Sequence, residues 1–324
     1  MNPATAPDGR KIVTVTPNPA LDITYLVPAL RPGHSHRVAP PLQRAGGKGL
    51  NVARVARQTG SAVLAIAPVG GATGTLLRTE LVQSGLPHML IQANTETRRS
   101  IAFVDETHHE TSIFNERGEE LASRVWGEIL AAVDGILEKK EAAVLVGSGS
   151  LPHHAPVSFY RDLTSHARRH LVPVIVDTSG PPLLEAARAG ADLLKPNHHE
   201  LSEATGESHL PTAARRLLQL GARIVLVSAG EKGMFAFTRD EPDTHWTASP
   251  PRTLTGNPTG AGDAAVAAAA ACLGAGADLP TLLRTATAWG AAAVLTRGAG
   301  EIAASFADLE KEVLVTQQKD TACH

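Results

Sequence analysis

The order of apolar runs and helical stretches constrains the fold of this chain more than any other feature. Apolar runs of strand length recur along the first 230 residues, and segments with helical periodicity separate them. This repeated strand–helix order predicts a mostly parallel sheet with helices on both faces and right-handed crossovers. The predicted strands are residues 11–16, 62–69, 142–148, 172–178, 191–197 and 223–230. The predicted helices are residues 49–59, 74–85, 124–138, 156–170, 181–189, 199–205 and 211–220.

Two segments, residues 22–44 and 99–116, interrupt this order with short strand pairs around turns and no helix between the partners. Hairpin-like pairs require antiparallel neighbours, so we expect them outside the parallel sheet, in a small second sheet. The predicted α/β domain comprises residues 11–21, 45–97 and 118–315, and the predicted β-sheet lid comprises residues 22–44 and 98–117.

Composition limits the classes of partner. The chain has 324 residues, 43% of them hydrophobic, which is enough for a large core. Lys and Arg number 30 against 32 Asp and Glu, so the chain lacks the basic surplus of nucleic-acid-binding proteins. The start resembles no signal peptide, and the alanine-rich run at 264–276 is too short to span a membrane. Two cysteines provide no disulfide framework, so we expect a cytoplasmic protein without a membrane or nucleic-acid partner.

Polar or glycine-rich motifs follow most of the predicted strands. Open α/β sheets bind ligands at the carboxyl ends of their strands. Polar composition is ordinary in any single loop, but its recurrence at one sheet edge favours a site. The motifs are TPNPALD (16–22), GSGSLP (147–152), DTSG (177–180), KPNHHE (195–200) and SAGEKG (228–233).

The segment GNPTGAGD (256–263) places glycines directly before the alanine-rich helix. Gly260 and Gly262 allow a tight turn whose N–H groups, with the positive end of the helix, form an anion-binding hole. Asp263 at this helix start has two interpretations. It caps the helix, or it acts as a general base beside a transferred phosphoryl group.

Two other nucleotide-binding motifs are excluded. Residues 260–265 match G-x-G-x-x-A, but they follow no apolar strand and no acid lies about 20 residues further on, which disfavours a Rossmann dehydrogenase. The Gly-Lys of AGGKGLN (45–51) has Leu42 and Gly49 where a Walker A loop requires Gly and Ser or Thr.

Together the motifs resemble a known family. AGGKGLNVARVARQTG (45–60) and GNPTGAGDAAVA (256–267) are similar to the two signatures of the ribokinase/phosphofructokinase B sugar kinases. The similarity extends over about residues 11–303, and TPNPALD, GGKGLN and TETR (95–98) resemble the branch acting on phosphorylated ketohexoses. That branch contains 1-phosphofructokinase, tagatose-6-phosphate kinase and the minor 6-phosphofructokinase. The resemblance implies a ribokinase-like fold with a lid.

The resemblance also implies roles for individual residues. Asp263 would be the catalytic base, with Gly260, Ala261 and Gly262 in the anion hole. Sugar hydroxyls would contact Asp22, Gly46, Gly47 and Asn51. ATP as co-substrate would lie against Lys195, Asn197, Ser228, Gly230, Gly233 and Gly260. Asn197 and Glu200 would hold a hydrated Mg²⁺ through water, since hard oxygen ligands suit this ion.

A phosphorylated substrate needs its own anion site, for which the candidates are Arg98, Ser150, Lys48 and Arg37. The alternative is that Arg98 and Arg37 are ordinary surface arginines. Fructose 1-phosphate is the favoured substrate, giving fructose 1,6-bisphosphate and ADP. Arg99 and Ser100 depart from the family pattern and leave fructose 6-phosphate and tagatose 6-phosphate as alternatives.

Histidine pairs at 108–109, 153–154 and 198–199 do not match H-E-x-x-H, and we interpret them as solvated side chains without a metal-binding role. An alternative function of another class is a catalytically silent sugar-phosphate or nucleotide sensor. Such a protein has no use for a base, so the presence of Asp263 favours the enzyme.

The lid predicts an oligomer. If one of its faces covers the sugar, the other exposes Tyr25, Val27, Ile101, Phe103 or their alternates. A monomer would not leave such a patch open, so we expect a homodimer through the lid sheet. The alternative is a mobile lid on a monomer.

Overall fold

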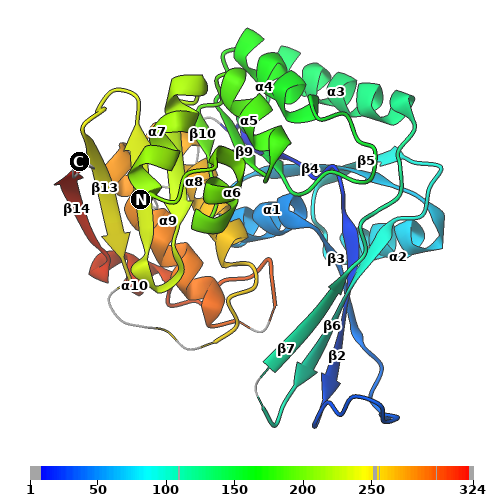
Figure 1. The fold of residues 1–324 in the computed structure, drawn as a ribbon. Helices are drawn as coiled ribbons and strands as arrows, with labels where there is room; N and C mark the ends of the chain where they lie inside the picture. The colour runs from blue at the N-terminus through cyan, green and yellow to red at the C-terminus, as the bar shows by residue number, and fades with distance from the viewer. Residues whose placement is uncertain (1–8, 109, 251–253, 255, 297, 321–324) are drawn as a thin grey trace.

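A ten-stranded sheet forms the body of the protein, and a four-stranded sheet projects from it (Figure 1). The computed structural model describes residues 9–108, 110–250, 254, 256–296 and 298–320. The strand order in the large sheet is β14-β13-β12-β11-β10-β9-β8-β1-β4-β5. From β11 to β5 all neighbours are parallel, whereas β11 to β14 pair antiparallel. The predicted mostly parallel sheet is confirmed.

The strands of the large sheet are β1 (Lys11–Val15), β4 (Val63–Val69), β5 (His88–Gln92), β8 (Ala142–Ser148), β9 (Val174–Asp177), β10 (Leu193–Leu194), β11 (Ile224–Ser228), β12 (Met234–Thr238), β13 (Thr244–Ser249) and β14 (Leu314–Lys319). All six strands predicted from apolar runs are present. The prediction did not include β5 or the antiparallel strands β12 to β14.

Helices cover both faces of this sheet, as each face buries its own hydrophobic cluster. One cluster includes Leu50 of α1 and Trp289 of α9, and the other includes Ile129 of α3 and Leu217 of α7. The first face carries α1 (Lys48–Gln58), α2 (Gly71–Gln83), α8 (Ala261–Gly274), α9 (Leu279–Val294) and α10 (Phe306–Glu312). The second carries α3 (Ser123–Glu138), α4 (Phe159–Arg169), α5 (Pro181–Arg188), α6 (His198–Thr205) and α7 (Leu210–Leu220).

The alanine-rich helix α8 lies at the centre of the first face. Its residues from Asp263 to Cys272 are all buried, and it packs against both α1 and α9. Alanine side chains allow this close approach, which a longer side chain would prevent. Among the described helices, none is both long and apolar enough to cross a membrane.

The small sheet, which we call the lid, has the order β3-β2-β6-β7. Its strands are β2 (Ala20–Val27), β3 (Leu42–Gly46), β6 (Arg98–Asp105) and β7 (Glu110–Asn115). The predicted second sheet is confirmed, and the two expected antiparallel pairs are β2 with β3 and β6 with β7. The central pair, which joins the two segments, was not predicted. Strands β2 and β6 are parallel, since each leaves the same edge of the large sheet, directly after β1 and β5.

Register divides the lid residues between two faces. Asp22 lies opposite Arg44 and Ser100 and faces the body, together with Arg98 and Asn115. Tyr25, Ile101, Phe103 and Phe114 alternate with these residues and lie on the outer face. Val27, which was predicted to be exposed there, is instead buried.

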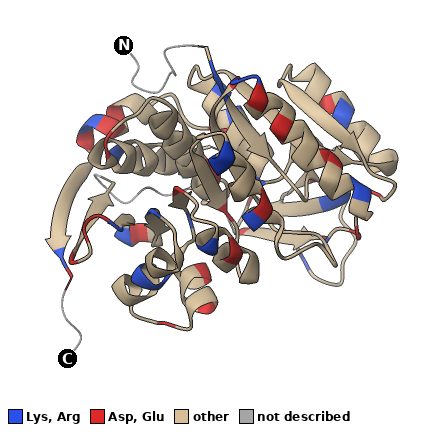
Figure 2. Ribbon diagram, turned by 90° about the horizontal axis from the view of Figure 1, so that it is seen from above, with Lys and Arg blue, Asp and Glu red and all other residues tan. Residues whose placement is uncertain are grey.

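Acidic and basic residues are interspersed over the molecule in the view of Figure 2. Many of them form pairs, such as Arg161 with Glu185 and Arg223 with Asp192. This distribution fits the near-neutral formal charge of −2.

Candidate active site

A cavity of about 1340 Å³ lies at the carboxyl ends of the parallel strands, between the body and the lid. It brings together segments from across the chain, because every parallel strand ends at this edge. Of the predicted site residues, Asp22, Gly47, Lys48, Asn51, Arg98, Ser150, Lys195, Asn197, Glu200, Ser228, Gly230, Gly233, Gly260, Ala261, Gly262 and Asp263 line it. Gly46 lies directly beneath Asp22, where a side chain would overlap the carboxyl group.

Asp263 lies in the first turn of α8 but does not cap it. The N-cap is Gly260, with a left-handed φ of 90°, and the helix start has no side-chain cap. Instead Asp263 Oδ2 accepts a hydrogen bond of 2.8 Å from Nδ2 of Asn51 on α1. Burial raises the pKa of Asp263 to about 6, although Lys48 opposes the shift. A carboxyl group with this pKa is well suited to accept a proton near neutral pH.

The anion hole is formed by the start of α8 and two neighbouring segments. A Cβ atom on Gly260 would lie 2.7 Å from Cα of Ala299, so only glycine fits at this turn. Lys195, at the end of β10, is buried and approaches the opposite side, with Nζ 3.3 Å from the position of a Cβ on Gly262. The hole therefore combines a helix N-terminus with a lysine cation, which together favour the binding of an anion.

Asp177 at the end of β9 was not predicted as a site residue. Its carboxylate is buried, accepts a hydrogen bond from Ser148 and lies 3.4 Å from Nζ of Lys48. Burial alone would raise the pKa of Asp177, but Lys48 and Lys195 outweigh it and hold the pKa below its usual value. Asp177 in turn raises the pKa of Lys48, so this lysine stays charged where it lines the cavity. The motif DTSG (177–180) indicated a polar strand end at Asp177, but it did not predict the contacts of Asp177 with Ser148 and Lys48.

Asp22 occupies the base of the lid. Burial raises the pKa of Asp22 to about 7, against the lowering effect of Arg98. The carboxyl group faces the cavity from β2, while Asp263 faces it from α8. A ligand that spans the cavity would contact both groups.

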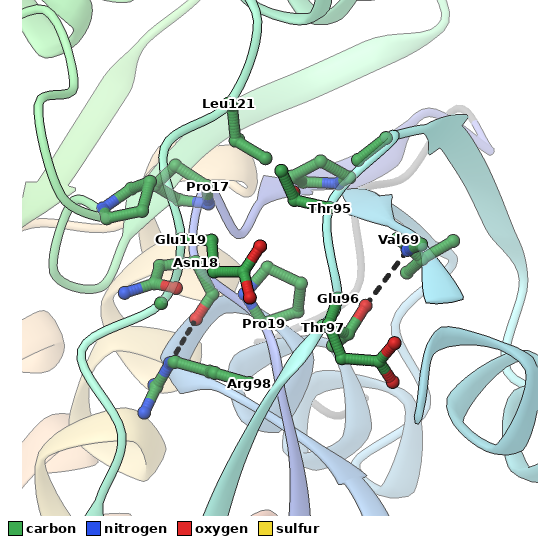
Figure 3. A pocket seen from close by; sticks show the side chains of 15 residues that line it. Pro17, Asn18, Pro19, Val69, Thr95, Glu96, Thr97, Arg98, Glu119 and Leu121 are labelled. Carbon is green, nitrogen blue, oxygen red and sulfur yellow. Dashed lines mark hydrogen bonds between the residues drawn. The ribbon is translucent and has the colours of Figure 1, made fainter. Parts of the chain in front are cut away.

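Arg98 and Ser150 are joined at one end of the cavity by Asn18, which the sequence prediction did not include. Arg98 donates from Nε to the Asn18 carbonyl (3.2 Å), and the Asn18 amide donates to Ser150 Oγ (3.3 Å). Figure 3 shows Arg98 and Asn18 beside a second, smaller hollow. That hollow has a volume of about 20 Å³, which is water-sized, so we assign it no ligand.

The N-x-x-E motif forms the start of α6. Asn197 Oδ1 accepts from the backbone N–H groups of His199 and Glu200, and Glu200 Oε2 accepts from the Asn197 N–H. This capping box uses Asn197 Oδ1, whereas Glu200 Oε1 lies 3.8 Å from Nζ of Lys48. Glu200 lines the cavity, and its carboxylate oxygen beside Lys48 would suit the water ligands of a hydrated Mg²⁺ on a nucleotide.

Arg37 differs from expectation, and two further residues line the cavity. Arg37 is exposed in the segment between β2 and β3 and does not line the cavity of its own chain. His153 is exposed, as the sequence interpretation expected, and it also lines the cavity together with Arg117. The Arg117 carbonyl lies close to Ser150, since the Asn18 amide donates to both (3.0 Å to the carbonyl).

Comparison with known proteins places this geometry in a family. Residues 18–305 match the pfkB family of carbohydrate kinases, and the chain belongs to this family. The predicted family, the sugar-phosphate kinase activity and the ribokinase-like fold are confirmed.

Individual relatives refine the placement. The chain is 36% identical over 303 residues to ATP-dependent 6-phosphofructokinase isozyme 2 of Mycobacterium tuberculosis, covering 91% of this chain and 88% of the relative. It is 33% identical to 1-phosphofructokinase of Xanthomonas campestris, covering 86% and 89%. Phosphofructokinase-2 of Escherichia coli, solved with potassium, superposes with a TM-score of 0.84 at 30% identity, over 93% of this chain and 98% of that one.

Proposed function

We propose that this protein phosphorylates a phosphorylated ketohexose with ATP, with fructose 1-phosphate as favoured substrate and fructose 1,6-bisphosphate and ADP as products. Asp263 carries the proposal, because it is a buried carboxyl group at the start of α8, beside the anion hole, and it does not cap this helix. The relatives named as ATP-dependent 6-phosphofructokinase and 1-phosphofructokinase support the substrate class and the donor.

The proposed chemistry is a direct phosphoryl transfer. Asp263 accepts the proton of the attacking sugar hydroxyl, whose oxygen forms a bond to the γ-phosphorus of ATP. The bond between that phosphorus and the bridging oxygen breaks, and ADP leaves. Lys48, Lys195 and the N–H groups at Gly260–Gly262 stabilise negative charge on the transferred group. Mg²⁺ bound with ATP would neutralise phosphate charge, with Asn197 and Glu200 holding its waters.

The proposed substrate contacts divide the cavity. Asp22, Gly46, Gly47 and Asn51 contact the sugar hydroxyls, and Arg98 with Ser150 binds the phosphate already on the sugar. Ser228, Gly230 and Gly233 border the nucleotide. The proposal places all of these roles in one cavity. Sixteen of the predicted site residues line this cavity.

The quaternary structure and location belong to the same proposal. The outer face of the lid carries Tyr25 stacked on Phe103 at 5.6 Å, and Phe103 meets Phe114 at 5.9 Å. We propose that this face pairs with the lid of a second copy. We also propose that the chain divides into two domains, the α/β domain and the lid. A related E. coli phosphofructokinase-2 has an inhibited form that is tetrameric. We place the enzyme in the cytoplasm, where ATP is available.

An ADP-release assay over fructose 1-phosphate, fructose 6-phosphate, tagatose 6-phosphate and free fructose tests the function. We expect turnover with the phosphorylated ketohexoses to exceed that with fructose, and fructose 1-phosphate to give the highest kcat/KM. Equal kcat/KM for fructose and its phosphates would refute the phosphate site. Binding of a sugar phosphate without ADP release would instead identify a sensor.

A further inference from the structure

Arg44, at the base of the lid on β3, bonds to a segment of the body far away in sequence. Its Nη1 donates to the Ala299 carbonyl (3.1 Å) and to Glu301 Oε1 (2.8 Å), and its Nη2 donates to the Gly300 carbonyl (3.3 Å). One guanidinium thus holds three acceptors of residues 299–301. The planar arrangement of arginine donors suits such multiple contacts, which a lysine cannot reproduce.

The segment 299–301 closes the back of the anion hole. Cα of Ala299 lies 2.7 Å from where a Cβ on Gly260 would be, and a Cβ on Gly300 would lie 3.0 Å from Asn51 Oδ1. Asn51 is the residue that donates to Asp263. A shift of residues 299–301 would therefore reach both the turn at Gly260 and the partner of Asp263.

The same arginine lies beside the sugar-facing carboxyl group. Arg44 is directly opposite Asp22 in the β2–β3 register, and its charge acts on Asp22. The next residue, Ala45, is anchored to the body, because its N–H donates to Glu80 (3.1 Å) and its carbonyl accepts from Arg54 (3.2 Å). Arg44 therefore lies at the junction of lid and body, between Asp22 and residues 299–301.

We infer that Arg44 is a positioning residue that couples the sugar end of the cavity to the anion hole, so that sugar phosphate and ATP strengthen each other's binding. This inference rests on the proposed function. A ligand held by Asp22 orders β2 and β3, Arg44 then orders residues 299–301, and the turn at Gly260 is ready for the phosphates. Coupling of this kind is reciprocal between the two ligands.

The test compares Arg44→Gln and Arg44→Lys with Arg57→Gln, a control on α1. Arg57 is an exposed arginine that donates to the Ser84 carbonyl, away from the cavity. Calorimetry gives the dissociation constant of the non-hydrolysable analogue AMP-PNP with Mg²⁺, with and without saturating fructose 1-phosphate. The ratio of the two constants measures the coupling, and a merely structural role of Arg44 would not change it.

We expect fructose 1-phosphate to tighten AMP-PNP binding about fivefold or more in the wild type and the Arg57 variant. In Arg44→Gln the ratio should fall below about twofold, and Arg44→Lys should also lie below the wild type. A wild-type ratio near one, or an unchanged ratio in both Arg44 variants, would overturn the role of Arg44. If Arg44→Gln does not fold, Arg44→Lys decides alone. Failure of the wild type to bind any phosphorylated ketohexose would instead refute the proposed function.

Discussion

The ten-stranded sheet and the lid differ in how their faces are covered. Helices bury both faces of the parallel region, so β8 and β9 are buried along their whole length. In the lid every residue of β7 is exposed, and Phe114 has 62% of its surface accessible. The body therefore holds its side chains in fixed positions by packing, whereas the lid has exposed surfaces, which we propose contact the sugar and a second chain. The proposed function uses both regions, with Asp263 as the base on the body and the sugar contacts at the junction of body and lid.

Removal of the proposed base, Asp263, should have the largest effect on turnover. Asp263→Asn keeps the size of the side chain and an oxygen that accepts from Asn51, but it cannot take a proton. We expect kcat to fall by about 10²–10⁴ while nucleotide affinity stays within about twofold.

The matched control is Asp278→Asn. Asp278 caps α9 by accepting from the Thr281 N–H, a contact that asparagine also makes, so kcat should not change. If Asp263→Asn retains more than about a tenth of the wild-type kcat, Asp263 is not the base, and the body contributes only charge stabilisation.

The same contrast explains which parts of the structure could be predicted from the sequence. Buried parallel strands read as continuous apolar runs, and the glycine motifs that follow them mark the ligand edge. The antiparallel strands β13 and β14 mix polar and apolar residues and give no such signal. Asp177 was missed because its partner Lys48 is 129 residues away, and Arg44 because its acceptors are 255 to 257 residues away. The lid was found from an interruption of the pattern, but its parallel central pair depends on where β1 and β5 end in space.

At the junction, Arg98 should determine preference for phosphorylated substrates. Arg98→Met removes a charge-assisted hydrogen bond worth about 1.5–3 kcal/mol, so kcat/KM for the phosphorylated ketohexose should fall about tenfold or more. Turnover of free fructose should not change. Arg99→Met is the control, since Arg99 points to the other face of β6 and contacts Thr73. A similar loss in both variants would mean that the strand, not the phosphate contact, was disturbed.

The pH dependence of kcat/KM should test Asp263 as the proposed base. The pKa of Asp263 is raised to about 6, and the base works only when deprotonated, so kcat/KM should fall as pH drops below 6. The expected loss is about tenfold per pH unit in the acid limb. Asp22 has a pKa of about 7, so if sugar binding needs its ionised carboxylate, the fall in kcat/KM should begin at a higher pH, near 7. Stable circular dichroism over pH 5–8 must accompany the profile, and a flat profile down to pH 5 would contradict this assignment.

A substitution on the outer face of the lid should have the smallest effect on activity and a large effect on the oligomeric state. Phe103 lies between Tyr25 and Phe114, so Phe103→Asp places a charge at the centre of the aromatic contacts. If the lids of two copies pair through this face, light scattering at micromolar concentration should show a wild-type dimer and a monomeric variant. Activity should fall only a few-fold, because Asp263 and the anion hole lie in the body. Val82→Asp, at a residue of α2 that is 64% exposed, should leave the dimer intact, since exposed apolar residues outside the lid are not part of the proposed interface. A fully active wild-type monomer would reject the dimer and leave the lid as a mobile cover on a single chain.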